Sequence, residues 1–286
     1  MDIIFKTLTD CKIEDIITAW NRGFEGYFVK IEMTPDSFFQ RIVNEGLSMG
    51  LSIVGFVGEK PVAIVVNGIR MIDGKKTAWN GGTGVVTEYR GKGVSRRLME
   101  ETLKVYQQEG VEVATLEAIK ENERAIRLYE KYGYEIVDSV VFANGKWEAD
   151  KSETSSMKVK SIRPEQLSLH SFYKENVPWQ CQWQSVKAGE AQVFYDSNDQ
   201  PLGYCLFRRV WNGQGELERV IIYQLEFLRE VTSPLMNGVL ASISDSATKQ
   251  VGIMTVNNSA TDQAIQFLLE NGYQIATEQV LMVKKF

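Results

Sequence analysis

A short segment near the middle of the chain recurs, in the same order, near its C-terminus, and this repeat constrains the fold more than any other feature. A shift of 139 residues places Gly133 on Gly272 and the pair Ala125-Ile126 on Ala264-Ile265. An ordered repeat over this distance predicts two copies of one structural unit. The chain length of 286 residues agrees, because a single domain usually has roughly 100–200 residues.

Composition excludes several classes of function. The chain has 32 Lys and Arg against 37 Asp and Glu, a net charge of −5, which is the wrong sign for a protein that mainly neutralises nucleic-acid phosphates. One histidine and three widely spaced cysteines offer neither a metal site nor a histidine-dependent hydrolase. The sequence contains no apolar stretch long enough for a signal peptide or a membrane span. We therefore expect a cytoplasmic protein without metal, nucleic acid or membrane as a partner.

Hydrophobic periodicity predicts the same order of elements in both halves. The first half predicts a strand at 3–8, helices beginning near Ile13 and Thr34, an antiparallel meander over 52–86, then helix 94–109, strand 111–119 and helix 122–132. The second half predicts strands over 191–227, helix 233–247, strand 251–256 and a final helix ending at Gly272. This order indicates an α+β, three-layer α/β/α fold in two tandem domains, each with a mixed, mostly antiparallel twisted sheet flanked by helices.

The boundary between the two domains is expected near Ser161, which gives a first domain over 1–160 and a second over 161–286. The polar stretch 144–156 before it has the composition of a hairpin tip that leads into a strand.

One segment of the first half has the composition of an anion-binding loop. Val85 and Val86 end a strand, and the run Arg90, Gly91, Lys92, Gly93 precedes an amphipathic helix that opens with Val94 and Ser95. Glycines let successive backbone N–H groups converge on one point, and the helix N-terminus adds its positive dipole. These residues fit a diphosphate cradle, and a solvated turn with a helix cap explains them equally well.

Two motifs together make the first half resemble the GNAT superfamily of acyl-CoA N-acetyltransferases. Arg90, Gly93 and Ser95 resemble its diphosphate motif Q/R-x-x-G-x-G/A, with a small serine at the last position. Residues 122–134 resemble its later segment N-x2-A-x3-Y-x3-G-F/Y, through Asn122, Ala125, Tyr129, Gly133 and Tyr134. The resemblance implies acetyl-CoA as cosubstrate and direct transfer of its acetyl group to an amine. The second half lacks both motifs, which implies a degenerate copy.

The resemblance also implies roles for single residues. Tyr129 would protonate the departing thiolate, and Asn122 with Ala125 would lie beside the pantetheine arm. That arm would enter between two splayed parallel strands, where an amide at about Val86 would polarise the thioester carbonyl. From the residues alone, Asn122 equally fits a helix N-cap and Tyr129 a core aromatic.

An aromatic loop supplies the candidates for the acceptor site. Phe24 and Tyr27, together with Trp79 on a strand, fit the walls of a pocket for a small amine. The amine must lose a proton before it attacks, and Glu25 is our prediction for the base, with Asp73 and Glu117 as alternatives. We therefore predict an N-acetyltransferase for a primary amine, and the alternative is a non-catalytic acetyl-CoA-sensing or interaction module.

Overall fold

The protein is described by a computed structural model in which the chain forms two compact units. The residues that the structure describes are 1–29, 31–148, 157–244 and 250–286. The first unit consists of Met1–Val137 with Val280–Phe286, and the second consists of Asp138–Gln279.

This division differs from the boundary expected after residue 160. Strand β6 (Glu135–Glu148) begins in the first unit and continues into the second. Strand β13 (Gln274–Lys285) begins in the second unit and continues into the first. Each copy of the repeat therefore gives the end of its last strand to the other unit, and a single cut in the sequence cannot separate the units. The residues 149–156 of the expected hairpin tip lie outside the described residues.

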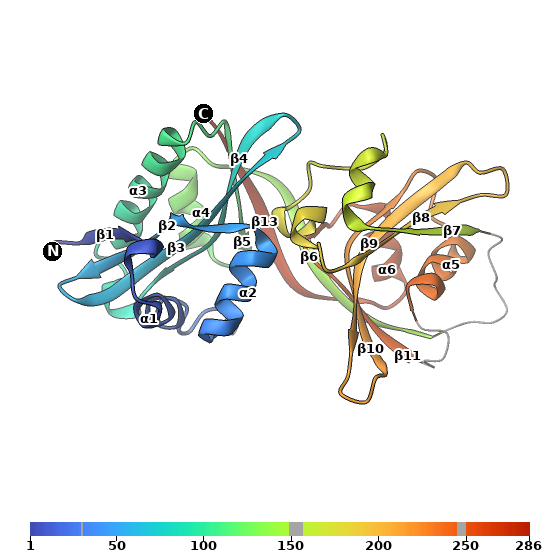
Figure 1. Ribbon diagram of the computed structural model, residues 1–286, viewed down its shortest axis with the longest axis horizontal. Helices are drawn as coiled ribbons and strands as arrows, with labels where there is room; N and C mark the ends of the chain where they lie inside the picture. The colour runs from blue at the N-terminus through green and yellow to red at the C-terminus, as the bar shows by residue number, and fades with distance from the viewer. Residues whose placement is uncertain (30, 149–156, 245–249) are drawn as a thin grey trace. The chain divides into compact units, whose positions relative to one another are not determined.

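The first unit is a mixed sheet with helices on both faces (Figure 1). Its strands follow the order β1-β2-β3-β4-β5-β13. The pairs from β1 to β4 are antiparallel, and β4 and β5 are parallel. Its other strands and its helices are β1 (Ile4–Thr7), α1 (Ile13–Gly23), α2 (Pro35–Glu45), β2 (Leu47–Val57), β3 (Lys60–Ile72), β4 (Lys75–Val85), α3 (Val94–Gln108), β5 (Val113–Ile119) and α4 (Glu123–Lys131).

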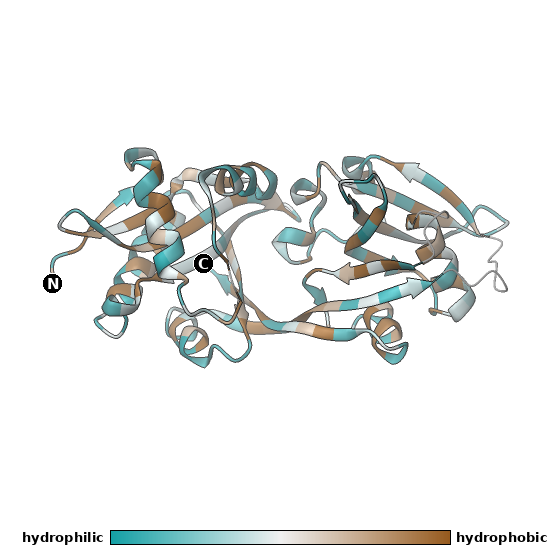
Figure 2. Cartoon of the chain, turned by 90° about the horizontal axis from the view of Figure 1, so that it is seen from below, coloured by the Kyte–Doolittle hydropathy of each residue, from teal (hydrophilic) through white to brown (hydrophobic). Residues whose placement is uncertain are grey.

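Alternation along β4 shows which helices cover which face of this sheet. Ala78 belongs to a buried cluster with residues of α3 and α4, such as Tyr106 and Tyr129. The next residue, Trp79, points to the opposite face, where the guanidinium of Arg41 on α2 lies 6.0 Å from its ring. Helices α3 and α4 thus pack on one face and α2 on the other. Figure 2 shows the matching pattern, with hydrophobic and hydrophilic sides on single helices.

The second unit repeats this plan in the order β6-β11-β10-β9-β8-β7, with β12 paired to β6. Here β10 and β11 are the parallel pair. Its elements are β7 (Lys158–Ile162), β8 (Glu190–Tyr195), β9 (Pro201–Trp211), β10 (Leu217–Phe227), α5 (Ser233–Ile243), β11 (Gln250–Thr255), β12 (Asn258–Ser259) and α6 (Gln263–Glu270). The end of the predicted helix 233–247 falls partly on residues 245–249, which lie outside the described residues.

The repeat found in the sequence is a structural repeat. Gly133 follows α4 and Gly272 follows α6, and their φ angles of +83° and +90° are left-handed. Glycine is favoured there because a Cβ would be strained. The predicted fold class, two tandem units with mixed, mostly antiparallel sheets and flanking helices, is confirmed.

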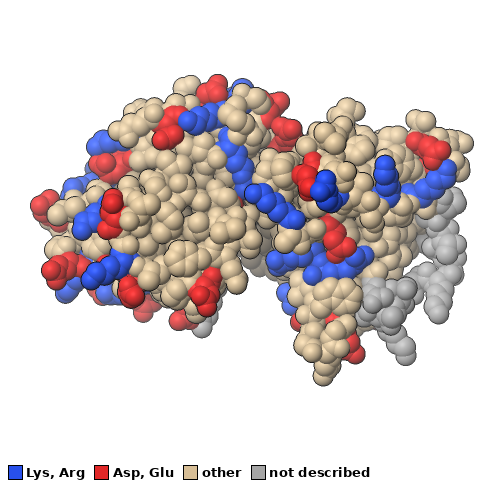
Figure 3. Space-filling model, viewed as in Figure 1, with Lys and Arg blue, Asp and Glu red and all other residues tan. Residues whose placement is uncertain are grey.

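Among the described residues, no helix combines the length and the apolar character needed to cross a bilayer. On the face seen in Figure 3, Lys and Arg side chains are interspersed with Asp and Glu.

Candidate functional site

The predicted diphosphate loop joins the 3-10 turn Thr87–Tyr89 to the first turn of α3. Gly91 and Gly93 have φ angles of +77° and +82°, a conformation that other residues adopt only with strain. A Cβ on Gly93 would have no heavy atom within 4 Å apart from its chain neighbours. The side of Gly93 on which a Cβ would stand is therefore open.

The N-terminus of α3 is the least neutralised helix start in the first unit. Thr34 caps α2 and Asn122 caps α4 through their side chains, whereas Gly93 has no side chain to do so. The first turn of α3 also contains no acidic residue. Its leading amides, those of Val94 and Ser95, therefore keep the positive end of the helix dipole available to an anion.

Two cations accompany the loop. Lys92 is exposed, with its ammonium 5.7 Å from the centre of the Tyr89 ring. Arg124, on the first turn of α4, holds its Nη2 atom 3.7 Å from the position of a Cβ on Gly91. Arg124 was not among the residues predicted from the sequence. The available signal was its place two residues after Asn122, at the start of the helix that follows β5.

The predicted cradle residue Arg90 does not turn its side chain toward the open side of the loop. Its guanidinium donates instead to the backbone carbonyls of Val85, Gly23 and Glu25. The backbone of Arg90 remains part of the loop, while its charge serves a different segment.

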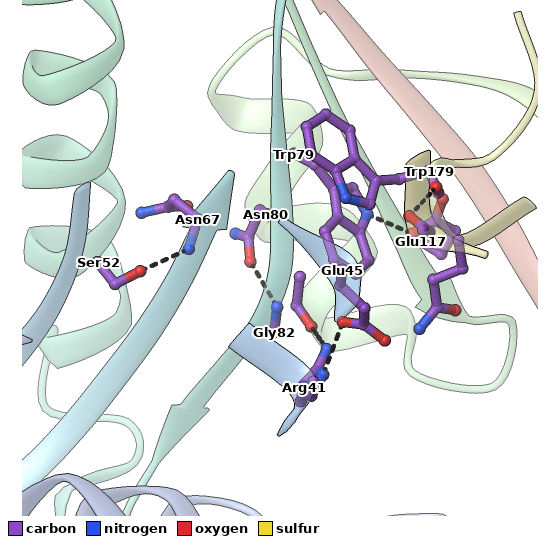
Figure 4. Close-up of polar contacts among 12 residues, drawn as sticks. Arg41, Glu45, Ser52, Asn67, Trp79, Asn80, Gly82, Glu117 and Trp179 are labelled. Atoms are coloured by element: carbon purple, nitrogen blue, oxygen red, sulfur yellow. Dashed lines mark hydrogen bonds and ion pairs between the residues drawn. The ribbon is translucent and has the colours of Figure 1, made fainter. Parts of the chain in front are cut away.

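Strands β4 and β5 separate at the centre of the sheet. Their parallel pairing ends at Asn80 opposite Leu116. Just beyond, the register of β4 against β3 shifts by one residue, so Gly81 forms a bulge. The Asn80 side chain stabilises this bulge by accepting a hydrogen bond from the Gly82 amide at 3.1 Å (Figure 4). The predicted gap between two splayed parallel strands is therefore present.

The Val86 amide, predicted as the donor to the thioester carbonyl, is already used. It donates to the Val62 carbonyl of β3 at 2.9 Å, because the pairing of β3 and β4 extends beyond Val85. Donors on a strand alternate between its two neighbours, so the amides of Thr83 and Val85 point away from β3 and into the gap. These two amides replace Val86 as the candidate oxyanion donors.

Four polar side chains from three segments meet beside this gap. The Tyr129 hydroxyl is hydrogen-bonded to the Thr83 side chain, and burial raises the pKa of Tyr129 to about 12. The Tyr27 hydroxyl is hydrogen-bonded to the side chain of Asn122, and burial raises the pKa of Tyr27. Asn122 also caps α4 by accepting from the Ala125 amide at 3.2 Å. The two interpretations of Asn122, cap and site residue, are therefore compatible.

The aromatic loop after α1 lines a cavity of about 370 Å³. Phe24, Glu25 and Tyr27 are in its wall, together with Asn21, Gly26, Val29, Ile31 and Glu32. The Phe24 and Tyr27 rings pack edge to face, with centroids 5.4 Å apart. Tyr27 therefore belongs both to the wall of this cavity and, through its contact with Asn122, to the polar cluster.

Trp79, predicted as a wall of the same pocket, does not line this cavity. It is buried on β4, and its indole N–H donates to the Glu117 carboxylate at 2.7 Å (Figure 4). Next to it, Arg41 donates to the Gly81 carbonyl at 2.5 Å and stacks over Trp20 at 4.9 Å. Trp79 and Arg41 therefore support the bulge of β4.

The second unit keeps the separated strands but carries large polar side chains where the first unit has glycines. Strands β10 and β11 pair up to Ile222 opposite Thr255, and β10 is irregular immediately afterwards. Where β4 has Gly82 and Gly84, β10 carries Gln224 and Glu226. Gln224 donates to the Cys181 carbonyl at 2.7 Å, and Glu226 pairs with Lys174 at 2.5 Å.

Helix α5 begins after Thr232 without a glycine loop. The described residues before α5 therefore contain no counterpart of the loop formed by Gly91 and Gly93. Within the described parts of both units, no group of three or more His, Cys, Asp or Glu side chains is arranged to hold a metal ion.

Known proteins share this fold and, over the first unit, its sequence pattern. The profile of the acetyltransferase (GNAT) family matches residues 8–134. No curated protein matches the chain by sequence.

Three solved structures illustrate the similarity in fold. A GCN5-related N-acetyltransferase from Sphaerobacter thermophilus is 13% identical, with a TM-score of 0.66 over 99% of this chain and 95% of its own. A GCN5-related N-acetyltransferase from Anabaena variabilis is 17% identical, with a TM-score of 0.60 over 99% and 72%. A tandem GNAT protein from the clavulanic acid biosynthesis pathway is 10% identical, with a TM-score of 0.62 over 99% and 98%. The chain therefore has a tandem GNAT fold, and residues 8–134 are a domain of the GNAT acetyltransferase family.

Proposed function

We propose that this protein transfers the acetyl group of acetyl-CoA to a primary amine of a small-molecule acceptor, by direct attack in a ternary complex. The observation that carries the proposal is the buried Tyr129 hydroxyl, which meets Thr83 where β4 and β5 separate. A cavity of about 370 Å³ beside this cluster has the size of a small-molecule site. Acetyl-CoA supplies the activated acyl carbon.

The residues of the first unit divide the binding work between them. Gly91, Gly93, Val94 and Ser95 present backbone amides to the diphosphate, and Lys92 with Arg124 adds positive charge. The amides of Thr83 and Val85 stabilise the negative charge that develops on the carbonyl oxygen. Because these donors are held by the sheet and by the bulge at Gly81, they need no rearrangement during the reaction.

The proton balance requires an acid and a base. The amine loses one proton as it attacks, and the sulfur gains one as it leaves, so the products are an amide and the free CoA thiol. Tyr129 is the proposed acid, because a phenol with a pKa of about 12 stays protonated at neutral pH. A free primary ammonium has a pKa near 10, so the attacking amine needs a base.

Glu25 remains our proposed base, since its side chain lines the cavity with Phe24 and Tyr27. Asp73 is less suitable, because it lies in the turn before β4, roughly 40 Å along the chain from Val85 at about 3.3 Å per residue. Glu117 is the second candidate, because it is the first residue of β5 beyond the pairing with β4. Glu25→Gln and Glu117→Gln variants distinguish the two. Loss of the true base should lower turnover mainly at pH values below the pKa of the amine, where the acceptor is protonated and needs a base.

The test is an acetyl-transfer assay with acetyl-CoA and a panel of primary amines, read by release of the CoA thiol and by the mass of the acetylated product. Turnover with at least one amine supports the proposal. Tight acetyl-CoA binding without turnover on any amine would favour the sensing module instead. The three cysteines are free thiols, consistent with the reducing cytoplasm in which we propose the enzyme works.

A further inference from the structure

Arg90 joins three segments of the first unit through one side chain. Its Nε donates to the Val85 carbonyl at 2.8 Å, and its Nη2 donates to the carbonyls of Gly23 at 2.9 Å and Glu25 at 3.1 Å. The side chain is partly buried. Hydrogen bonds from a charged guanidinium are about twice as strong as neutral ones, so this contact fixes the segments firmly to one another.

The three carbonyls belong to distinct functional segments. Gly23 is the last residue of α1, where a cation also neutralises the negative end of the helix dipole. Glu25 lies in the wall of the cavity, two residues before Tyr27. Val85 ends β4 and carries one of the two amides that face the gap.

The backbone of Arg90 begins the glycine loop. One residue therefore belongs to the loop through its backbone and binds the three carbonyls through its side chain. The loop has other cations for a diphosphate. Lys92 and Arg124 both stand beside it, and no described residue forms an ion pair with either side chain. The Arg90 guanidinium is thus not needed at the loop and instead binds the carbonyls of Gly23 and Glu25.

We propose that Arg90 is a positioning residue of the acceptor site, and that it transmits occupancy of the diphosphate loop to the cavity-lining segment 23–29. An anion that orders the loop also orders the Arg90 backbone, and the guanidinium then holds the carbonyls of Gly23 and Glu25 in place. Occupancy of the loop therefore restrains further a wall that these hydrogen bonds already hold. The inference rests on the proposed function, since it assigns the loop to acetyl-CoA and the cavity to the acceptor.

Two variants separate the two roles. Arg90→Met keeps an unbranched side chain that reaches about as far as Nε of arginine and removes all the donors, while Arg90→Lys keeps a cation with fewer and less directional donors. Arg124→Gln is the matched control, since it removes a cation beside the same loop without touching segment 23–29. Acetyl-CoA affinity is measured by calorimetry, and amide hydrogen exchange over 23–29 is measured with and without saturating acetyl-CoA.

We expect acetyl-CoA to slow exchange over 23–29 in the unchanged protein. In Arg90→Met, affinity should stay within about threefold, while exchange over 23–29 becomes roughly tenfold faster and insensitive to acetyl-CoA, because hydrogen bonds to a charged group are lost. Arg90→Lys should be intermediate. Arg124→Gln should weaken affinity by about tenfold and keep the protection at saturation.

The opposite pattern overturns the proposal. In that case, Arg90→Met would weaken acetyl-CoA affinity as much as Arg124→Gln does and would leave the protection of 23–29 from hydrogen exchange unchanged. Failure of the proposed function has a different signature, since the unchanged protein would then not bind acetyl-CoA. In that case, the exchange rates of unliganded Arg90→Met and unchanged protein still show whether Arg90 holds the segment.

Discussion

At the scale of single residues, Tyr129 occupies the central position of the candidate site. Its hydroxyl is buried, bonded to Thr83 and held at a pKa of about 12. We expect Tyr129→Phe to lower kcat by roughly tenfold to a thousandfold, because a general acid contributes in this range. Acetyl-CoA affinity should change little, since the phenyl ring and its packing remain. Steady-state kinetics with calorimetry measures both quantities.

The pKa of Tyr129 also sets the sign of a pH effect. Tyr129 should stay protonated up to about pH 12, so its titration cannot cause a fall of kcat between pH 7 and 10. An unchanged kcat in Tyr129→Phe at saturating substrates would remove Tyr129 from the mechanism. Tyr27→Phe serves as a comparison, because it removes a neighbouring hydroxyl for which no role in proton transfer is proposed.

Three buried tyrosines allow a matched test of how hydroxyl partners affect stability. The hydroxyls of Tyr134 and its repeat equivalent Tyr273 have no hydrogen-bond partner among the described residues, whereas Tyr106 donates to Asn67 at 2.7 Å. An unsatisfied buried polar group costs about 1–3 kcal/mol. We therefore expect Tyr134→Phe and Tyr273→Phe to raise the free energy of unfolding, by about 1 kcal/mol each.

Tyr106→Phe is the control, and it should lower the free energy of unfolding by a similar amount, because it leaves the Asn67 carbonyl without its donor. Urea denaturation of the three variants measures the difference. A loss of stability in all three would contradict the assignment of Tyr134 and Tyr273 as unsatisfied.

Single-residue roles were only partly predictable from the sequence. Tyr27, Asn122 and Tyr129 were each singled out, and the structure brings them together. Thr83 was missed, because a hydroxyl between two glycines on a strand carries no recognisable pattern. The donor amide was predicted only as lying at about Val86, and the Val86 N–H bonds to β3, since the direction of each N–H depends on the register with that strand.

At the scale of elements, the loop before α3 combines a backbone requirement with a binding requirement. Gly93 has left-handed φ with open space around it, and so has Gly110 at the other end of α3. Gly93→Asp should abolish acetyl-CoA binding, because it places a negative charge in the anion cradle. Gly110→Asp should cause a similar backbone strain, about 1–2 kcal/mol, with acetyl-CoA affinity unchanged.

Calorimetry on the two glycine variants, with their melting temperatures as a check on folding, measures this difference. Equal loss of affinity in both variants would mean that general destabilisation, rather than the loop, is responsible.

Local signals predicted most elements well. Thr34 followed by Pro35 marks the start of α2, and the structure shows a capping box at this point. Gly110 and Gly133 mark helix ends through their left-handed φ. These signals lie within a few residues of the feature that they specify, so a sequence can show them.

At the scale of the whole molecule, the chain exchanges strand ends between its two units. Val280 and Met282 of β13 are buried in the first unit, in the cluster that contains Ala114, Leu116 and Tyr134. The sequence did not predict this exchange, because the choice of strand partner depends on contacts far apart in the chain. For the same reason, the two compact units divide the chain differently from the expected boundary at residue 160.

Removal of residues 280–286 tests the importance of this exchange. We expect the truncated chain to lose acetyl-CoA binding, although the cradle residues are almost 200 positions away in sequence, because the first unit loses a core strand. A milder variant, Met282→Ala, should lower the free energy of unfolding by about 2–5 kcal/mol. Normal binding and stability of the truncated chain would show that the strand is dispensable.

We propose that the first unit alone binds acetyl-CoA and that the second unit has lost this ability. The most direct test of this proposal is a calorimetric titration of the whole chain with acetyl-CoA, which gives stoichiometry as well as affinity. The account predicts one site per chain, which Gly93→Asp abolishes. Two sites per chain, or one site that survives Gly93→Asp, would contradict it.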